Sequence, residues 1–294
     1  MVGKRYVANK QQQGYLFIAP AAIALILLVL YPLIYGIVIS FYDTNLVNKW
    51  NFVGAQYYLE LIRKPAFLNS LKTTFVFTGQ VVFGHIVFGV VMAFLLNTKI
   101  LGRLFFRALF ILPWIVPEVV VGVVWKWIYN PMYGLLNSVL TYLNIISEPL
   151  LWISNPTMAM PSVVAACIWK GFPMVMMMTL AGLQTISPDL YEAAEIDGAH
   201  KLQIHYYITM PLLVPVMLVV FVLDTVWWFK HFNIIYVLTG GGPVDVTKVV
   251  AIDIYRTAFD SFQFGRSSAM AVIVMLICLL ISIVYRRLLG HDNT

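Results

Sequence analysis

The sequence predicts an all-α, polytopic membrane protein with six transmembrane helices. Hydrophobic residues make up 61% of its 294 residues and charged residues only 11%, whereas a soluble domain carries about 25% charged residues. The mean hydropathy is +0.85. The apolar residues are also gathered into runs of roughly 20 or more, the length that a helix needs to cross the hydrocarbon core of a bilayer.

The six apolar runs follow one another along most of the chain. We expect the helices at about residues 15–41, 72–97, 104–129, 158–185, 212–237 and 267–286. The third contains Glu118 and Lys126, the fourth contains Lys170, and the fifth contains Asp224 and Lys230. A charged side chain inside a membrane is costly, so each of these residues needs a partner or a function.

Basic residues predict the orientation of these helices. Six helices place both termini on one side of the membrane, and that side holds most of the basic clusters. The positive-inside rule makes it the cytoplasm. The clusters are Lys4, Arg5 and Lys10 before the first helix, Lys99, Arg103 and Arg107 between the second and third, and Arg286 and Arg287 after the sixth.

Charge and cysteine content exclude several classes of protein. The basic residues lie beside apolar runs, so the net charge of +6 reflects membrane orientation and predicts no nucleic-acid partner. Cys167 and Cys278 lie inside apolar runs, where a cysteine acts as a small buried hydrophobe. We therefore expect no disulfide, no metal site and no catalytic residue. The first run is too long for the core of a signal peptide, so it should remain as the first transmembrane helix.

Two segments predict departures from simple spanning helices. Residues 132–146 carry apolar side chains at helical spacing and predict a short helix lying at the membrane interface. Gly171 and Pro173 should break or bend the fourth helix and free backbone carbonyls near the middle of the membrane.

The most polar segment near the cytoplasmic face, residues 187–211, predicts a short helix outside the bilayer. Ser187 can cap the helix, Pro188 suits its first position, and Asp189 and Glu192 complement the positive end of its dipole. Gly198 can end the helix in the left-handed conformation. The helix should cover about residues 188–197.

This segment carries a resemblance to a known family. Glu192-Ala193-Ala194, then Gly198, then Ile208-Thr209-Met210-Pro211 resembles the EAA signature of binding-protein-dependent ABC importer permeases, with Met210 where the family pattern has leucine. Further matches are to the sugar-importer permeases of the maltose and glycerol-phosphate group. They are Leu16–Pro20, Tyr31-Pro32, Tyr236–Pro243, Thr247 and Tyr255–Phe259.

The resemblance implies a type I ABC importer permease with a five-helix core. Residues 1–70 would form the N-terminal tail, first helix and external loop, residues 71–289 the core with the coupling segment 187–211, and residues 290–294 a short cytoplasmic tail. The sequence has no Gly-rich phosphate loop with a following Lys-Ser/Thr, so ATP and Mg would bind to separate ATPase subunits and this chain would be no enzyme. The implied coupling residues are Glu192, Ala193, Ala194, Asp197, Gly198 and Pro211.

The resemblance also implies partners and a location. They are a second permease subunit, expected to be a different, homologous chain, two ATPase subunits, a periplasmic or extracellular solute-binding protein and a saccharide. The chain would lie in the cytoplasmic (inner) membrane of a bacterium.

Counting from the shared motifs, the sugar-contacting positions of the group fall on eight residues. They are Cys167, Lys170, Gly171, Met174, Asp224, Trp227, Trp228 and His231. Lys170 and His231 would suit a saccharide bearing a carboxylate or phosphate, and the two tryptophans could stack on sugar rings. The alternative is that Lys170 and Asp224 form an ion pair that only holds two helices together. Asp224, Trp227, Trp228 and His231 have the spacing of one helix face.

Three other interpretations compete with the importer, and one of them is a purely structural membrane subunit. A secondary transporter of a small polar solute would need more helices, or an internal repeat with paired broken helices. An intramembrane enzyme could use His85, Glu118, Asp224 and His231, but these residues lack the spacing of metal ligands.

Overall fold

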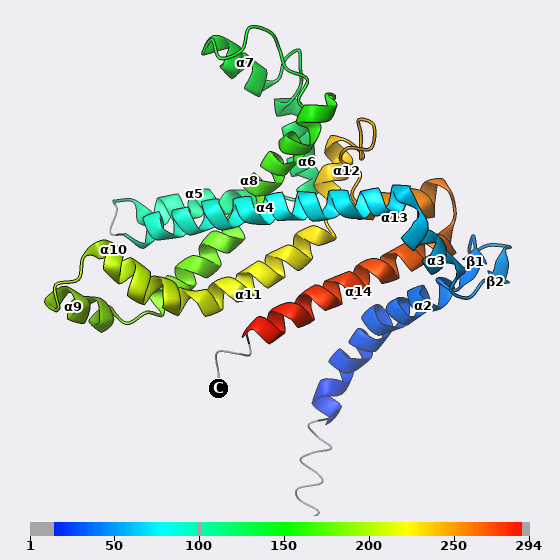
Figure 1. Cartoon of the computed structure of the whole chain (residues 1–294), viewed down its shortest axis with the longest axis horizontal. Coiled ribbons are helices and arrows are strands. Elements are labelled where there is room, and N and C mark those ends of the chain that lie inside the picture. Colours follow the sequence, from blue (N-terminus) through cyan, green and yellow to red (C-terminus); the bar gives the residue numbers. More distant parts are fainter. Residues whose placement is uncertain (1–14, 99–100, 290–294) are drawn as a thin grey trace, which may run out of the picture. The chain divides into compact units, whose positions relative to one another are not determined.

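A computed structural model describes residues 15–98 and 101–289 and is almost entirely helical (Figure 1). Five of its described helices are long and apolar enough to cross a membrane, and a sixth span is counted if one bent helix pair is taken together. Five of the six predicted membrane helices are therefore present as single helices, and the third corresponds to the bent pair. Lys4, Arg5, Lys10, Lys99 and the tail 290–294 lie outside the described residues.

The chain divides into two compact units. One unit contains the residues before Lys64 and Ile254–Ile273, and the other contains Lys64–Asp253 and the chain from Val274. The first unit begins with the membrane helix Tyr15–Ile39, which has a π-helical turn at Ile26–Leu30 and ends as α2 (Tyr31–Ile39). It also contains strands β1 (Tyr42–Thr44) and β2 (Trp50–Phe52), helix α3 (Gln56–Arg63) and a π-helical turn at Arg256–Asp260. Helices α13 (Val250–Tyr255) and α14 (Phe264–Leu289) have residues in both units.

The antiparallel hairpin β1–β2 was not expected from the sequence. Asn45 Oδ1 accepts hydrogen bonds from the backbone N–H groups of Val47, Asn48 and Lys49 and so closes the turn. The Lys49 ammonium lies 2.6 Å from the Asp43 carboxylate, and this contact lowers the pKa of Asp43. Side-chain acceptors for turn N–H groups make such a turn stable without core burial.

The second unit is built around two long helices that pack closely. It contains α4 (Pro65–Asn97), α5 (Arg103–Ile115), α6 (Glu118–Ile128), α7 (Leu135–Tyr142), α8 (Pro156–Gln184), α9 (Pro188–Ile196), α10 (Lys201–Ile204), a π-helical turn (His205–Thr209), α11 (Met210–Phe229) and α12 (Asn233–Leu238). Glycines permit the contact between α4 and α8, because a Cβ at Gly84 would lie 2.2 Å from Ile168 and a Cβ at Gly89 would lie 2.7 Å from Val175. Small residues allow membrane helices to approach in this way.

The third predicted span is not one straight helix. It is broken into α5 and α6, which meet at an angle of 97°. The residue before a proline avoids the helical region, and Val116, which precedes Pro117, has an extended ψ of 131°. The expectation of a continuous third helix was wrong at this point.

The fourth predicted span shows the opposite result. We expected a break or a bend near Gly171 and Pro173; helix α8 runs unbroken from Pro156 to Gln184 with Pro161 and Pro173 inside it, so there is no break. Neighbouring helices compensate for prolines inside membrane helices, and Pro173 is buried against such neighbours.

Two further boundaries concern the segments around α7 and α11. The expected interfacial helix within 132–146 appears as α7, Leu135–Tyr142. The expected fifth span ended near residue 237, whereas α11 ends at Phe229. Lys230 and His231 therefore lie beyond the helix, and His231 does not continue the helical face of Asp224 as the spacing had indicated.

Candidate functional site

Helix α9 is formed by local sequence chemistry, as predicted. Ser187 Oγ accepts a hydrogen bond from the backbone N–H of Asp189 (3.3 Å), and proline follows the cap. At the other end Gly198 has a φ of +81°. The N–H of Gly198 donates to the carbonyl of Glu195 (3.1 Å) and the N–H of Ala199 to the carbonyl of Ala194 (2.9 Å), the pair of bonds that defines a Schellman motif.

The residues of α9 are open to solvent. None of them is buried, and Ile196 is 86% exposed. Among the six predicted coupling residues, Ala194 is half-buried and the others are exposed: Glu192, Ala193, Asp197, Gly198 and Pro211. The Tyr191 hydroxyl lies 3.4 Å from Thr209 Oγ1, so the helix is attached to the start of the next membrane helix by its inner side.

Acidic residues and large exposed apolar residues lie together on α9 and the segment after it. Four acidic residues and no basic ones lie in 187–199: Asp189, Glu192, Glu195 and Asp197. Large apolar side chains are exposed beside them, including Leu202 at 82% and Tyr207 at 72%. Exposed apolar side chains gathered on one surface often mark a protein-binding site.

A second group of polar residues lies between α4, α8 and α11, within the membrane helices. His85 Nδ1 lies 2.8 Å from Asp224 Oδ2, and His85 Nε2 lies 3.1 Å from the carbonyl oxygen of Cys167. His85 and Asp224 are 0% and 1% exposed. The imidazole of α4 thus joins α11 and α8.

The two contacts of His85 limit which ring nitrogens can carry a proton. A carbonyl oxygen can only accept, so Nε2 must donate to Cys167. The contact between Nδ1 and Asp224 then requires one more proton, either on the ring or on the carboxyl group. The pair carries no net charge in either case, which makes its burial possible.

Lys170 has other partners than Asp224. Its ammonium donates to the backbone carbonyls of Pro113 (3.1 Å), Trp114 (2.6 Å) and Val116 (2.8 Å). These carbonyls end α5 at the break between α5 and α6, where a helix terminus leaves carbonyls without partners and a partial negative charge. The sequence-based alternative of a Lys170–Asp224 pair is therefore wrong, although both residues hold helices together.

The remaining predicted substrate residues are differently exposed. Cys167 and Gly171 are buried, and a Cβ on Gly171 would lie 2.3 Å from His85. Met174 is half-buried. Trp228 is 4% exposed, whereas its neighbour Trp227 is 56% exposed, because successive helical residues point about 100° apart.

Glu118 and His231 lie close to this group. The Asn233 side chain donates to Glu118 Oε2 (2.6 Å), so Glu118 has the structural partner that its position required. His231 is 5% exposed, stacks on Trp228 at 4.3 Å between ring centroids, and has no hydrogen-bond partner for Nε2 among the described residues. The break between α5 and α6 lies nearby, and the sequence feature that could have predicted it is the pair Pro113 and Pro117.

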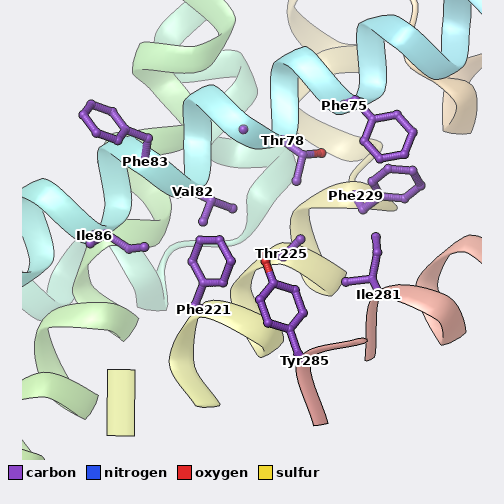
Figure 2. Close-up of a pocket in the computed structure, with 11 residues that line it drawn as sticks. Phe75, Thr78, Val82, Phe83, Ile86, Phe221, Thr225, Phe229, Ile281 and Tyr285 are labelled. Carbon is purple, nitrogen blue, oxygen red and sulfur yellow. The ribbon is translucent and has the colours of Figure 1, made fainter. Parts of the chain in front are cut away.

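A separate cavity of about 330 Å³ lies beside the group (Figure 2). Its lining is largely apolar and comes from α4, α11 and α14. In Figure 2, Thr78 on α4 and Thr225 on α11 face it from two sides, and the Thr78 hydroxyl lacks a partner among the described residues. None of the eight predicted substrate residues lines this cavity.

Comparisons with known proteins give one consistent result. The family model for the binding-protein-dependent transport system inner membrane component matches residues 85–289. The chain is 34% identical to the trehalose/maltose transport system permease protein MalF of Thermococcus litoralis, over 93% of this chain and 92% of that protein. It is 32% identical to the sulfoquinovosyl glycerol transport system permease protein SmoG of Agrobacterium fabrum, over 93% and 89%.

Solved structures agree in fold. A crystal structure of a bacterial ABC transporter involved in the import of the acidic polysaccharide alginate gives a TM-score of 0.84 at 20% identity, over 97% of this chain and 98% of that chain. A second structure, of a bacterial alginate ABC transporter in complex with an alginate pentasaccharide-bound periplasmic protein, gives 0.79 at 22% identity, over 94% and 93%.

Proposed function

The chain belongs to the family of binding-protein-dependent transport system inner membrane components, and on that premise we propose that it is the permease subunit of an ATP-driven importer of a carbohydrate. The substrate class is supported by the named transport systems of its relatives, which handle trehalose and maltose in one case and sulfoquinovosyl glycerol in another. The protein moves a solute and catalyses no reaction itself.

Helix α9 is the observation that carries the proposal. It is capped at both ends, none of its residues is buried, and it presents acidic and apolar groups. A permease without a nucleotide site needs such a surface to receive force from a separate ATPase. Glu192, Ala193, Ala194, Asp197, Gly198 and Pro211 would make this contact, and Glu192 would pair with a basic residue of the partner.

The assembly would contain further subunits. We infer a second, homologous permease chain, two ATPase subunits that bind ATP and Mg, and a periplasmic or extracellular solute-binding protein. The complex would lie in the cytoplasmic membrane of a bacterium with both termini of this chain inside. A secondary transporter with paired broken helices fits less well, because the described residues contain one bent helix pair.

The eight residues near α8 and α11 remain our candidates for the sugar site: Cys167, Lys170, Gly171, Met174, Asp224, Trp227, Trp228 and His231. Trp227 is exposed and could stack on a sugar ring. His231 Nε2 has no hydrogen-bond partner within the described part of the chain and could bind an acidic group. The three ammonium donors of Lys170 are all engaged, so this residue would reach a substrate only if the α5–α6 break changes during transport.

ATP hydrolysis by the reconstituted complex tests the proposal. The chain would be purified with its neighbouring subunits in nanodiscs, with the binding protein and with neutral and acidic oligosaccharides in turn. We expect one saccharide to stimulate hydrolysis, and Glu192→Arg to abolish the stimulation. Glu148→Arg, an exposed acidic residue outside α9, is the matched control. Unchanged stimulation in Glu192→Arg would contradict the coupling role of α9.

A further inference from the structure

Two arginines meet at the end of the membrane helices where α9 begins. Arg107 Nη2 lies 2.9 Å and Arg103 Nη2 lies 3.3 Å from the side-chain oxygen of Gln184, with the amide turned to face them. Arg107 also donates to the carbonyl of Leu96 (3.5 Å). The start of α5 and the last turns of α4 and α8 thus converge on two guanidinium groups.

These two positive charges have no carboxylate partner among residues 15–98 and 101–289. Like charges four residues apart on a helix repel each other, and Arg103 stands at the positive end of the α5 dipole. A neutral amide oxygen and a helix carbonyl offset this only in part. Arg107 Nε is in addition buried and has no hydrogen-bond partner among the residues that the structure describes. The site is therefore electropositive and suits an anionic ligand.

We propose that this site binds the phosphate of an anionic phospholipid. Paired guanidinium groups match the geometry of phosphate oxygens, and basic pockets between membrane helices on the cytoplasmic side bind lipid headgroups. Gln184 is exposed and both arginines are half-buried, so a headgroup can reach them. Leu104 and Phe105 beside Arg103 are 79% and 67% exposed, and they offer an apolar surface to acyl chains that free phosphate would not need.

The site lies next to the segment that leads into α9. Gln184 is the last residue of α8, and Ser187, three residues later, caps α9. A bound headgroup would hold the segment from which α9 projects. Lipid binding itself does not depend on the proposed transport function, whereas any effect of the lipid on ATP hydrolysis does.

Native mass spectrometry of the purified complex tests the inference directly. Wild-type protein should retain phosphatidylglycerol more strongly than phosphatidylcholine. Arg103→Gln/Arg107→Gln should weaken phosphatidylglycerol retention by about thirtyfold, while Lys201→Gln, an exposed basic residue following α9, should leave it unchanged. Arg103→Lys/Arg107→Lys keeps the charge without the planar guanidinium group. Its phosphatidylglycerol retention should lie between those of the wild type and the double glutamine variant, which would separate the effect of geometry from that of charge.

Three results would overturn the proposal. Equal retention of the two lipids would remove the anion preference, and this arm needs no variant. Displacement of the lipid by millimolar inorganic phosphate would assign the site to a soluble anion. Arginine variants that lose an ATPase subunit and keep the lipid would make the site a protein contact. A complex that binds the lipid but shows no saccharide-stimulated hydrolysis would contradict the proposed function alone.

Discussion

The exposed segment around α9 and the buried polar group between α4, α8 and α11 hold their residues in place by different means. In α9 each end is fixed by residues next to it in the chain, Ser187 at the start and Gly198 at the end. In the polar group the partners are far apart: His85 reaches Asp224, and Lys170 reaches carbonyls at the α5–α6 break. Local chemistry predicted the first region residue by residue, whereas the partners in the second depend on how helices are arranged.

Removing one member of the buried pair should have the largest effect. Asp224→Ala leaves His85 with an unsatisfied polar edge in a dry interior, and breaking such a pair costs about 3–5 kcal/mol of unfolding free energy. Thermal unfolding of the purified complex measures it. His85→Phe/Asp224→Leu, which removes both polar groups, should recover much of the loss. Wild-type stability in Asp224→Ala would show that the pair does not join the helices.

Loss of the Lys170 contacts at the α5–α6 break should have the second largest effect on stability. Lys170→Met removes three hydrogen bonds to the carbonyls of Pro113, Trp114 and Val116, and we expect a loss of about 2–3 kcal/mol, since bonds to charged groups are the stronger ones. Lys126→Met is the matched control, because Lys126 is exposed and makes one bond of 3.3 Å to the Val237 carbonyl. Equal loss in both variants would deny Lys170 its role at the break.

A glycine pair tests how tightly the buried region is packed. An added methyl at Gly171 would lie 2.3 Å from His85 and 2.8 Å from Trp228, and overpacking of this kind costs about 1–3 kcal/mol. An added methyl at Gly79 meets nothing within 4 Å. Gly79→Ala should therefore be neutral or stabilising in the same unfolding measurement, because alanine favours helices more than glycine. Similar stability of the two variants would contradict the close approach of the three helices.

The smallest effect is expected in α9. Gly198→Ala places a Cβ at a φ of +81°, which costs about 1–2 kcal/mol locally. Global unfolding should hardly change, because nothing else packs on this glycine. Hydrogen exchange at the amides of Gly198 and Ala199 would report fraying of the helix end. Gly198→Asn tolerates the left-handed conformation and should preserve the protection, so equal exchange in both variants would weaken the case for the Schellman motif.

The break between α5 and α6 is the clearest feature of the fold that the sequence did not predict. We expected a break or bend at Gly171 and Pro173, whereas the structure has a break at Val116-Pro117. Proline removes one hydrogen bond in either helix, but neighbouring helices decide whether the loss is compensated. Pro173 is buried inside the packed helix α8, whereas the carbonyls before Pro117 are taken up by Lys170 from that same helix. The residues next to either proline in the sequence do not reveal which helices pack against it.

The sequence by itself determined the membrane class, the approximate helices, the capped helix α9 and the glycine that ends it. These depend on hydropathy and on side chains that act on backbone groups within a few residues. Only the tertiary structure decided that Lys170 and Asp224 have separate partners, that Trp227 is exposed while Trp228 is buried, and that Arg103 and Arg107 converge on Gln184. The physical reason is that a charge in a low-dielectric interior takes the nearest complementary group, and distance along the chain does not reveal which group that is.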